Sequence, residues 1–430
     1  MNVLVIGLGS AGDVHPMVGL ALALRRRGHR ATLVAASVFE PLARRIGLEF
    51  IGLGTDLEYR EAIQDPDLWH PYRSFTVVCK RLILPVMRAV YEIAARRSRS
   101  GEALVVAPAT AFGARIASER LGVPLATAHL QPSLLRSVHQ SPCYGFPDVL
   151  GHLPRPLRRL YLRGVDRFLI DRLLASEVNA FRTELRLHPV RRIFDRWMHS
   201  TQLVLGLFPE WFAPQQPDWP PNVHFAGFPL FDESGSRAPS AELADFLVAG
   251  EPPIVFTAGS ANAQAREFFR VSVEVCRAAG RRAILLTQFP EVLPHRLCEG
   301  VRHFDYVPFS QALPHARAIV HHGGIGTVAH ALAAGAPQLV VPSAHDQPDN
   351  AVRVCRLGVG SMLLPKQYKT GAVLQRLDRL LNSPSVMENC RRRAKDLAGN
   401  TALDKACVLI EQLAGQADRV VAPAEGEEKV

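Results

Sequence analysis

The chain has 430 residues, of which 48% are hydrophobic and 21% charged, and a formal net charge of +10. This length exceeds one ordinary hydrophobic core, so we expect two domains of a globular protein and exclude a disordered or fibrous chain. Apolar runs stay shorter than the roughly 20 residues of a membrane-spanning helix, so any membrane contact is expected to be peripheral.

The distribution of charges and cysteines narrows the class of protein further. The arginines are scattered along the chain, which indicates solvated helix faces and not a nucleic-acid-binding patch. The seven cysteines show neither CxxC nor metal-ligand spacing, which predicts reduced thiols in a cytoplasmic protein. Met1 leads directly into a predicted strand, so we expect no signal peptide.

The chain opens with a strand, a glycine turn, a helix and a second strand. These are predicted by the aliphatic run Asn2–Ile6, by helical apolar spacing over residues 17–29 and by residues 30–37. Such a βαβ unit requires a parallel sheet with a right-handed crossover. The pattern continues with a helix, a strand, a helix, a strand and a long loop at residues 71–92, 103–107, 111–121, 124–128 and 131–154.

Prolines crowd residues 209–229, and a second alternating series begins at Pro253. We therefore predict an α/β protein with two doubly wound, Rossmann-like domains facing a central cleft, and ligands at the carboxyl ends of the strands. The last helix is expected to end near Leu413 and could cross back to the N-terminal domain. The predicted parts are domains 1–212 and 236–413, a linker at 213–235 and a disordered tail at 414–430.

The most informative stretch is residues 321–350, HHGGIGTVAHALAAGAPQLVVPSAHDQPDN. A glycine turn follows an apolar strand and opens an alanine-rich helix, so free backbone N–H groups and the helix dipole make an anion site. His322 and Thr327 flank the turn and can donate further hydrogen bonds. Asp346 and Gln347 follow the next strand and suit sugar hydroxyls. The stretch predicts a nucleotide-sugar site.

Gly7, Gly9 and Gly12 form a GxGxxG pattern between the first strand and the first helix, typical of dinucleotide binding. A nicotinamide cofactor also needs an acid at the end of the second strand, where this chain has Ala-Ala-Ser at residues 35–37. The missing acid argues against an oxidoreductase. The glycines are expected to allow a tight turn, close helix packing and the approach of a ligand.

Asp13, just after that turn, has two interpretations. As an N-cap it would only start the helix, whereas as a general base it would be ionised at neutral pH and accept a hydroxyl proton. His15 is the rival base, because the ordinary pKa of histidine lies nearer neutrality. Residues two apart point to different sides of a helix, so we expect only one of them to act.

The sequence leaves the roles of two further residues open. Ser260 follows a predicted strand and could contact a phosphate or cap a helix, and Tyr306 could stack on a nucleobase or belong to the core. The histidines lack a zinc-binding pattern such as HExxH, so no metal is expected.

Together these motifs resemble the family 1 glycosyltransferases of GT-B fold. His322, Gly324, Thr327 and the segment 342–347 match the spacing of the family's C-terminal signature. The resemblance implies sugar binding by Asp346 and Gln347 and nucleobase binding by Tyr306 and Val307. It implies diphosphate binding by His322, Gly326 and Thr327. We also predict diphosphate contacts at Gly12, Ser260 and Gly324.

The segment GDVHP, residues 12–16, matches the part of the family that carries the catalytic base, which favours Asp13 over His15. Plant-type members have a glutamate for the ribose hydroxyls at the position of His330. Its replacement is compatible with a deoxyribose and hence with a dTDP-sugar.

To about residue 410, the chain also looks like the rhamnosyltransferases of rhamnolipid biosynthesis, in stretches such as LFPEWFAPQQPDWP and AHDQPDN. That resemblance implies inverting transfer of L-rhamnose from dTDP-L-rhamnose to the hydroxyl of a 3-(3-hydroxyalkanoyloxy)alkanoate, with no metal or other cofactor. Residues 72–91 and 131–146 are candidates for the acceptor pocket. A lipid acceptor would suit peripheral contact with the inner membrane surface or with a partner acyltransferase.

Three alternatives remain. One is a family 1 transferase that moves another dTDP- or UDP-sugar to a sterol, macrolide or other apolar acceptor. The second is a non-catalytic activator of a partner transferase, which the presence of Asp13, His322, Asp346 and Gln347 disfavours. The third is a nicotinamide-dependent oxidoreductase.

Overall fold

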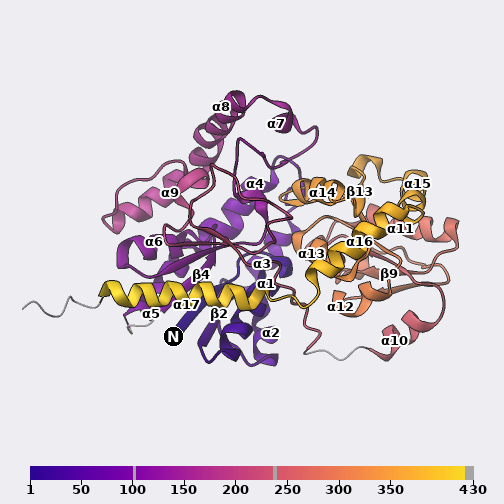
Figure 1. Cartoon of the computed structure of the whole chain (residues 1–430), viewed down its shortest axis with the longest axis horizontal. Helices are drawn as coiled ribbons and strands as arrows, with labels where there is room; N and C mark the ends of the chain where they lie inside the picture. The colour runs from indigo at the N-terminus through magenta and orange to yellow at the C-terminus, as the bar shows by residue number, and fades with distance from the viewer. Residues whose placement is uncertain (100–102, 236–239, 422–430) are drawn as a thin grey trace, which may run out of the picture.

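The computed structural model describes residues 1–99, 103–235 and 240–421. Two parallel sheets with helices around them form the two halves of the molecule (Figure 1). The N-terminal sheet has seven strands in the order β3-β2-β1-β4-β5-β6-β7, and the C-terminal sheet has six in the order β10-β9-β8-β11-β12-β13. The two predicted doubly wound sheets are therefore present.

The N-terminal half contains β1 (Asn2–Ile6), α1 (Ala11–Arg26), β2 (Arg30–Ala36), α2 (Glu40–Arg45), β3 (Glu49–Leu53), α3 (Asp56–Gln64), α4 (Ser74–Val78), α5 (Leu84–Ser98), β4 (Ala103–Pro108), α6 (Phe112–Leu121), β5 (Leu125–His129), α7 (Val149–His152), α8 (Arg155–Val165), α9 (Asp171–Glu184), β6 (Leu203–Gly206) and β7 (Val223–Phe225). A π turn at Cys79–Ile83 joins α4 to α5, and another at Asp166–Ile170 joins α8 to α9.

The C-terminal half contains α10 (Ala241–Val248), β8 (Ile254–Thr257), α11 (Arg266–Ala279), β9 (Ala283–Leu286), β10 (Val301–Phe304), α12 (Phe309–Ala312), β11 (Ala318–His321), α13 (Ile325–Ala334), β12 (Gln338–Val340), α14 (Gln347–Arg356), β13 (Gly360–Met362), α15 (Thr370–Leu381) and α16 (Pro384–Leu397). Helix α17 (Ala402–Val421) ends the described chain. Among the described residues, no helix combines the length and the hydropathy needed to cross a membrane.

The continuous aliphatic sequence of β1 follows from burial on both faces of the sheet. Val3 and Val5 belong to one hydrophobic cluster, and Leu4 and Ile6 belong to another on the opposite face. Helices cover both faces of a parallel sheet, so each residue of a central strand is buried. The first cluster continues into the C-terminal half through α13, so apolar packing joins the two halves.

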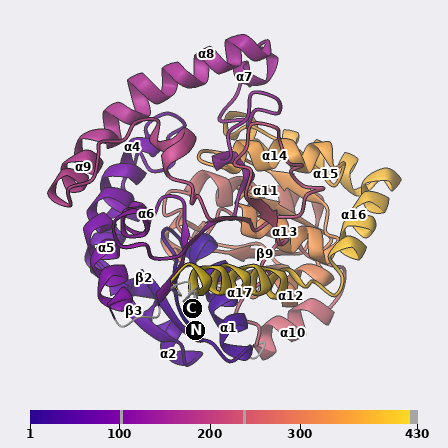
Figure 2. The same ribbon diagram turned by 60° about the vertical axis from the view of Figure 1, so that its left-hand side comes forward.

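Helix α17 returns from the C-terminal half to pack on α1, as Figures 1 and 2 show. Arg27 donates to both carboxylate oxygens of Glu411 at 2.8 and 2.7 Å, and Nε2 of His29 lies 2.7 Å from the same carboxylate. Below these polar contacts, Ala406 and Ile410 are fully buried. The last helix therefore crosses back to the N-terminal half.

Three boundaries differ from those predicted. Helix α1 begins at Ala11 and not near residue 17, because Ser10 is its N-cap and the carboxylate of Asp13 accepts from the Ser10 amide. The segment predicted as a linker, 213–235, contains strand β7, which pairs with β6 and buries Val223. Helix α17 continues to Val421, so the first part of the predicted tail is helical. The rest of that tail lies outside the described residues.

Helices α5 and α6 pack so closely that a side chain at Gly113 has no room. A Cβ there would lie 2.0 Å from the carbonyl oxygen of Met87 and 2.7 Å from the amide nitrogen of Tyr91. We expect Gly113→Ala to destabilise the protein by about 3 kcal/mol, because the backbones of both helices must move apart. The thermal unfolding midpoint measures this loss.

Gly164 on α8 is the matched control, because a Cβ there would meet no atom within 4 Å. We expect Gly164→Ala to raise stability by about 0.5 kcal/mol, since alanine loses less backbone entropy in a helix. Equal midpoints for the two variants would contradict the close packing of α5 and α6.

Candidate functional site

The strand order reverses between β1 and β4 in the N-terminal sheet and between β8 and β11 in the C-terminal sheet. Ligands of doubly wound proteins bind beyond the carboxyl ends of the strands at such switch points. The turn after β1 carries Gly12 and Asp13, the turn after β8 carries Ser260, and the turn after β11 leads from His322 into α13. The topology therefore places these predicted residues at the switch points.

The N-termini of α1 and α13 face each other from the two halves. A Cβ on Gly326 would lie 4.0 Å from the carbonyl oxygen of Gly12, and each glycine is the second residue of its helix. The first backbone hydrogen bonds of the two helices are donated by Asp13 at 2.9 Å and by Val328 at 3.0 Å, so the amides before them point out of the helix ends. This contact, called the α1–α13 junction below, concentrates positive potential suited to a diphosphate.

Asp13 lies in the first turn of α1 and is held by the residue that caps it. The amide and hydroxyl of Ser10 donate to Oδ2 of Asp13 at 2.9 and 3.2 Å, which closes a capping box. Ser10, and not Asp13, is thus the N-cap. The carboxylate rests against Gly9, where φ is +124° and a Cβ would lie 2.3 Å from Oδ2. Only glycine leaves room for this carboxylate, and Oδ1 is the oxygen that could accept a substrate proton.

Asp13 and Asp346 form a pair of carboxyl groups from opposite halves. Burial raises the pKa of Asp13 to about 6, against the lowering effect of the Ser10 hydrogen bonds. Burial, assisted by the charge of Asp13, raises the pKa of Asp346 to about 7. The negative charge of the pair is therefore held mainly by Asp13, and Asp346 is the carboxyl group that keeps its proton to higher pH.

His321 and His322 are adjacent in sequence but differ in environment. His321 is fully buried, its Nδ1 accepts from the Gly323 amide at 3.1 Å, and its Nε2 therefore donates to Oε1 of Gln338 at 3.1 Å. Burial lowers its pKa to about 3, so it is a neutral core residue. Its hydrogen bonds fix the strand end from which the turn starts.

His322 instead lies against the turn glycines. A Cβ on Gly259 or on Gly324 would come within 2.9 or 2.5 Å of Nε2, so the ring packs on the backbone at the start of α13. Burial lowers the pKa of His322 to about 4. In this state it is a neutral hydrogen-bonding group, and the helix N-terminus carries the positive potential.

The two predicted sugar-binding residues start α14. Asp346 is its N-cap and accepts from Nδ2 of Asn350 at 2.6 Å. The Oε1 atom of Gln347 accepts from the amides of Ser343 and Ala344 at 2.8 and 3.3 Å, so its amide group is the part suited to a sugar hydroxyl. Thr327 is buried in the first turn of α13.

His15 and Tyr306 both contact the segment that joins the halves. His15 Nε2 lies 3.3 Å from the carboxylate of Glu233, and the Tyr306 hydroxyl donates to the carbonyl of Asp232 at 2.6 Å. Their rings meet edge to face with centroids 6.3 Å apart. His15 is thus directed at an internal carboxylate, which favours Asp13 as the base.

The structure changes the interpretation of Ser260. It is exposed in the loop after β8, and α11 begins only at Arg266 with Ala265 as its N-cap. The helix-cap alternative for Ser260 is therefore wrong, and phosphate contact stays a prediction. Val307, predicted at the nucleobase, is buried in the core of the C-terminal half.

Sequence reasoning missed several residues of the site. Asn350 bridges the carbonyl of Gly323, at 2.9 Å, and the carboxylate of Asp346. The i,i+4 spacing from Asp346 on a predicted helix could have revealed it. Tyr59 on α3 lies close enough for the charge of Asp13 to add to the burial that raises its pKa. No sequence signal links Tyr59 to Asp13.

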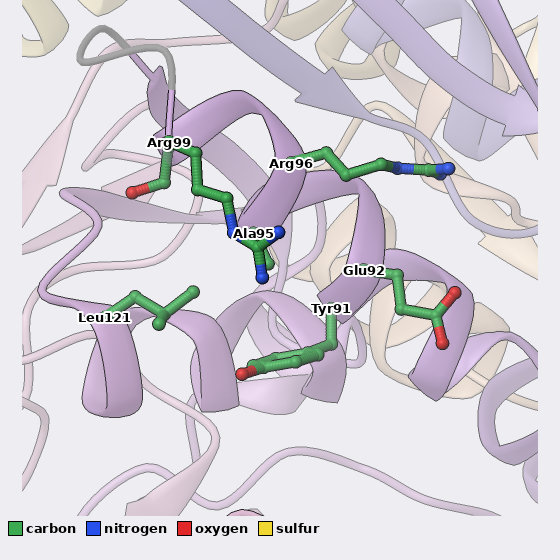
Figure 3. Close-up of a pocket in the computed structure, with 7 residues that line it drawn as sticks. Tyr91, Glu92, Ala95, Arg96, Arg99 and Leu121 are labelled. Carbon is green, nitrogen blue, oxygen red and sulfur yellow. The ribbon is translucent and has the colours of Figure 1, made fainter.

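A separate hollow of about 430 Å³ lies between α5 and α6 (Figure 3). Its lining includes Tyr91, Arg96, Arg99 and Leu121. These residues are near the C-terminal ends of helices that lead into β4 and β5, so the hollow is at the amino ends of the strands. It lies on the opposite edge of the sheet from Asp13.

Two family models match the chain, the N-terminal domain of glycosyltransferase family 28 over residues 3–140 and the C-terminal domain of erythromycin biosynthesis protein CIII-like proteins over residues 285–407. The O-mycaminosyltylonolide 6-deoxyallosyltransferase of Streptomyces fradiae is 31% identical over 435 residues, which cover 96% of this chain and 98% of that protein. The chain belongs to the family 1 and family 28 type of GT-B glycosyltransferases. It is therefore a glycosyltransferase that uses a nucleotide-sugar donor.

Solved structures confirm the fold of this glycosyltransferase. The calicheamicin glycosyltransferase CalG4 superimposes with a TM-score of 0.70 at 22% identity, covering 98% of this chain and 99% of that one. Glycosyltransferase VinC, solved in complex with dTDP, gives 0.68 at 20% identity, with coverage of 97% and 100%. The predicted GT-B fold of two Rossmann-like domains is thus confirmed.

The raised pKa of Asp13 makes the pH dependence of the glycosyltransferase a test of its role. A general base must be ionised, so we expect kcat/KM for the acceptor to fall as pH decreases through about 6. The pH–rate profile of the purified enzyme at saturating donor measures this fall, which forms the acidic limb of the profile. Asp346→Asn should lower the rate but leave the limb near pH 6, because Asp346 is already uncharged there. A limb that disappears in Asp346→Asn would assign the titration to Asp346.

Proposed function

We propose that this glycosyltransferase moves L-rhamnose from dTDP-L-rhamnose to the hydroxyl of a 3-(3-hydroxyalkanoyloxy)alkanoate and so makes a monorhamnolipid, in the cytoplasm. The observation that carries the transfer chemistry is the α1–α13 junction, where a carboxylate of raised pKa lies beside two helix N-termini. Support for the sugar comes from the Streptomyces fradiae relative, named for a 6-deoxyallosyl group. Rhamnose is likewise a 6-deoxyhexose.

In this mechanism Asp13 removes the proton of the acceptor hydroxyl while that oxygen attacks the anomeric carbon. The dTDP group leaves from the opposite side of the sugar ring, so the configuration inverts in one displacement. The amides at the start of α13 and the side chains of His322 and Thr327 receive the charge that develops on the diphosphate. Asp346 and the amide of Gln347 orient the sugar hydroxyls. We propose that no metal is required.

The environment of His330 is in keeping with a deoxyribose nucleotide. Its Nδ1 lies 4.0 Å from the carboxylate of Asp232, and burial lowers the pKa of His330 although the charge of Asp232 acts in the opposite direction. The imidazole is thus turned toward the connecting segment and offers no carboxylate to a ribose 2′-hydroxyl. This supports dTDP over UDP.

A second candidate is transfer of another dTDP- or UDP-sugar to a macrolide or other apolar acceptor. The observation that favours it is the name of the Streptomyces fradiae relative, which specifies a tylonolide as acceptor. Both candidates use the same donor machinery and differ in the acceptor pocket of the N-terminal half.

Asp13→Asn tests the catalytic assignment. We expect turnover to fall by about 10²-fold or more, because the amide cannot take the proton, while the affinity for dTDP stays nearly unchanged. Single-turnover rates and a dTDP titration separate the two effects. His15→Ala is the matched comparison and should retain most of the turnover. The reverse pattern would move the base to His15.

Thermal-shift titration with dTDP, UDP, GDP and NAD⁺ tests the donor. We expect stabilisation by dTDP well above that by UDP, and none by NAD⁺, because a ligand that binds only the folded state raises the unfolding temperature. Rhamnosyl transfer to the hydroxyalkanoyloxy lipid, followed by mass spectrometry beside a macrolide and a sterol, tests the acceptor. An equal or stronger response to UDP would overturn the rhamnose assignment.

A further inference from the structure

The outer edge of the N-terminal half carries a helical segment with an apolar exposed face. This outer segment, residues 155–172, comprises α8, the π turn and the start of α9, and it lies on the rim of the molecule in Figures 1 and 2. Leu157, Leu160, Tyr161 and Phe168 leave 49, 67, 52 and 70% of their surface exposed. The spacing of three and four residues places Leu160 and Tyr161 on the same face of α8 as Leu157, and Phe168 lies in the π turn that continues the helix.

This concentration of apolar surface is unusual for the chain. Of the thirteen large hydrophobic residues that are exposed in the described structure, five lie between residues 157 and 169. Single exposed hydrophobic residues need no explanation, but a contiguous group marks a contact surface. The buried face of the same helix, with Leu162, already packs on the protein, so the apolar exposed face is not part of the core.

The same segment is strongly basic. Its exposed arginines are Arg155, Arg159, Arg163, Arg167 and Arg172. The acids within it are turned inward: Asp166 is buried in an ion pair with Arg136, and the Asp171 carboxylate accepts from the amides of Arg192 and Ile193 at 2.8 and 3.1 Å. The outward charge is therefore positive.

A cavity lies on the inner side of α8, where the buried Leu162 is part of its lining. It has a volume of about 740 Å³, and Arg159 and Arg163 of α8 line it together with Arg196. Guanidinium groups bind phosphate oxygens with two parallel hydrogen bonds. Asp166, Asp195 and Asp218 also line the cavity, so its charge is mixed, and the arginines offered to a bilayer are those exposed on the outer segment.

We propose that the outer segment docks this glycosyltransferase on an anionic lipid bilayer. Leu157, Leu160, Tyr161 and Phe168 enter the interface between headgroups and acyl chains, and the arginines contact lipid phosphates. A helix with an apolar face and arginines beside it is the pattern that lies in the plane of a membrane surface. Charge complementarity selects the anionic bilayer over a second copy of the chain, whose corresponding face is equally basic.

The helix is fixed to the loop that leads toward the other half. Arg158 donates to the carbonyls of Gly151 and Leu153 at 2.6 Å each and to that of His139 at 3.1 Å. Further along this loop the amide of Cys143 donates to Asp349 of α14 at 3.1 Å. Docking at the outer segment therefore holds the acceptor side of the enzyme near the lipid. Binding is measured without turnover, so the docking stands or falls separately from the proposed acceptor.

Sedimentation of the full chain with large vesicles tests the proposal. We expect binding to vesicles of equal parts phosphatidylcholine and phosphatidylglycerol and weak binding to phosphatidylcholine alone. Leu160→Glu and, separately, Phe168→Ser should lower the vesicle-bound fraction by about tenfold, because each removes apolar area from the interface. Arg159→Gln with Arg163→Gln should weaken binding to the anionic vesicles by about fivefold per arginine. A higher salt concentration should also weaken this binding, because it screens the charges.

Two controls lie elsewhere on the surface. Val248→Ser changes an apolar side chain that is 82% exposed on α10, and Arg379→Gln removes an exposed charge on α15. Both should bind vesicles like the unchanged protein, and all variants should keep its unfolding temperature. Absence of binding to anionic vesicles, or equal loss in the controls, would overturn the proposal. A dimer seen by light scattering that Leu160→Glu dissociates would also overturn it, in favour of self-association.

Discussion

Two helix N-termini of like partial charge meet where the halves of this glycosyltransferase face each other. The distance of 4.0 Å between the carbonyl oxygen of Gly12 and a Cβ on Gly326 shows how near they are. Parallel sheets impose this arrangement, because every helix that follows a strand starts at the carboxyl edge of its sheet. Such a contact is favourable only if negative charge lies beside it. Asp13 supplies part of that charge, and a diphosphate would supply the rest.

The acidic groups of the site follow from this constraint. A carboxylate at a helix N-terminus is stabilised by the dipole, yet the pKa values of Asp13 and Asp346 are raised. Burial thus outweighs the dipole, and a proton can be held or released near neutral pH. The neutral His322 fits the same balance, since a buried cation beside two helix N-termini would be repelled. The protein provides dipoles and a single carboxylate, and leaves room for the charge of the donor.

Local pattern was enough to predict much of this architecture. The aliphatic β1, the glycine turn before α13 and Asp346 after β12 stand where periodicity and turn residues placed them. Contacts between distant segments could not be predicted in this way. The carboxylate of Glu233 reaches His15 and Arg45, and Asp232 accepts from the amide of Ser310 at 2.6 Å. Both acids come from the segment predicted as a linker, 213–235, whose sequence does not indicate buried residues, so their burial follows from tertiary packing.

The return of α17 also limits how the protein can be divided. The described chain leaves the N-terminal half after β7 and returns to it at α17, so the N-terminal core is completed by a helix that follows the whole C-terminal half in sequence. Ala406, Cys407 and Ile410 bury their side chains against residues of α1 that were made some 380 positions earlier, a separation that the Arg27–Glu411 pair spans. An N-terminal fragment without α17 would expose this groove to water. The two halves are thus distinct in architecture but interdependent in folding, and neither is a self-contained module that could be exchanged between enzymes at the connecting segment alone.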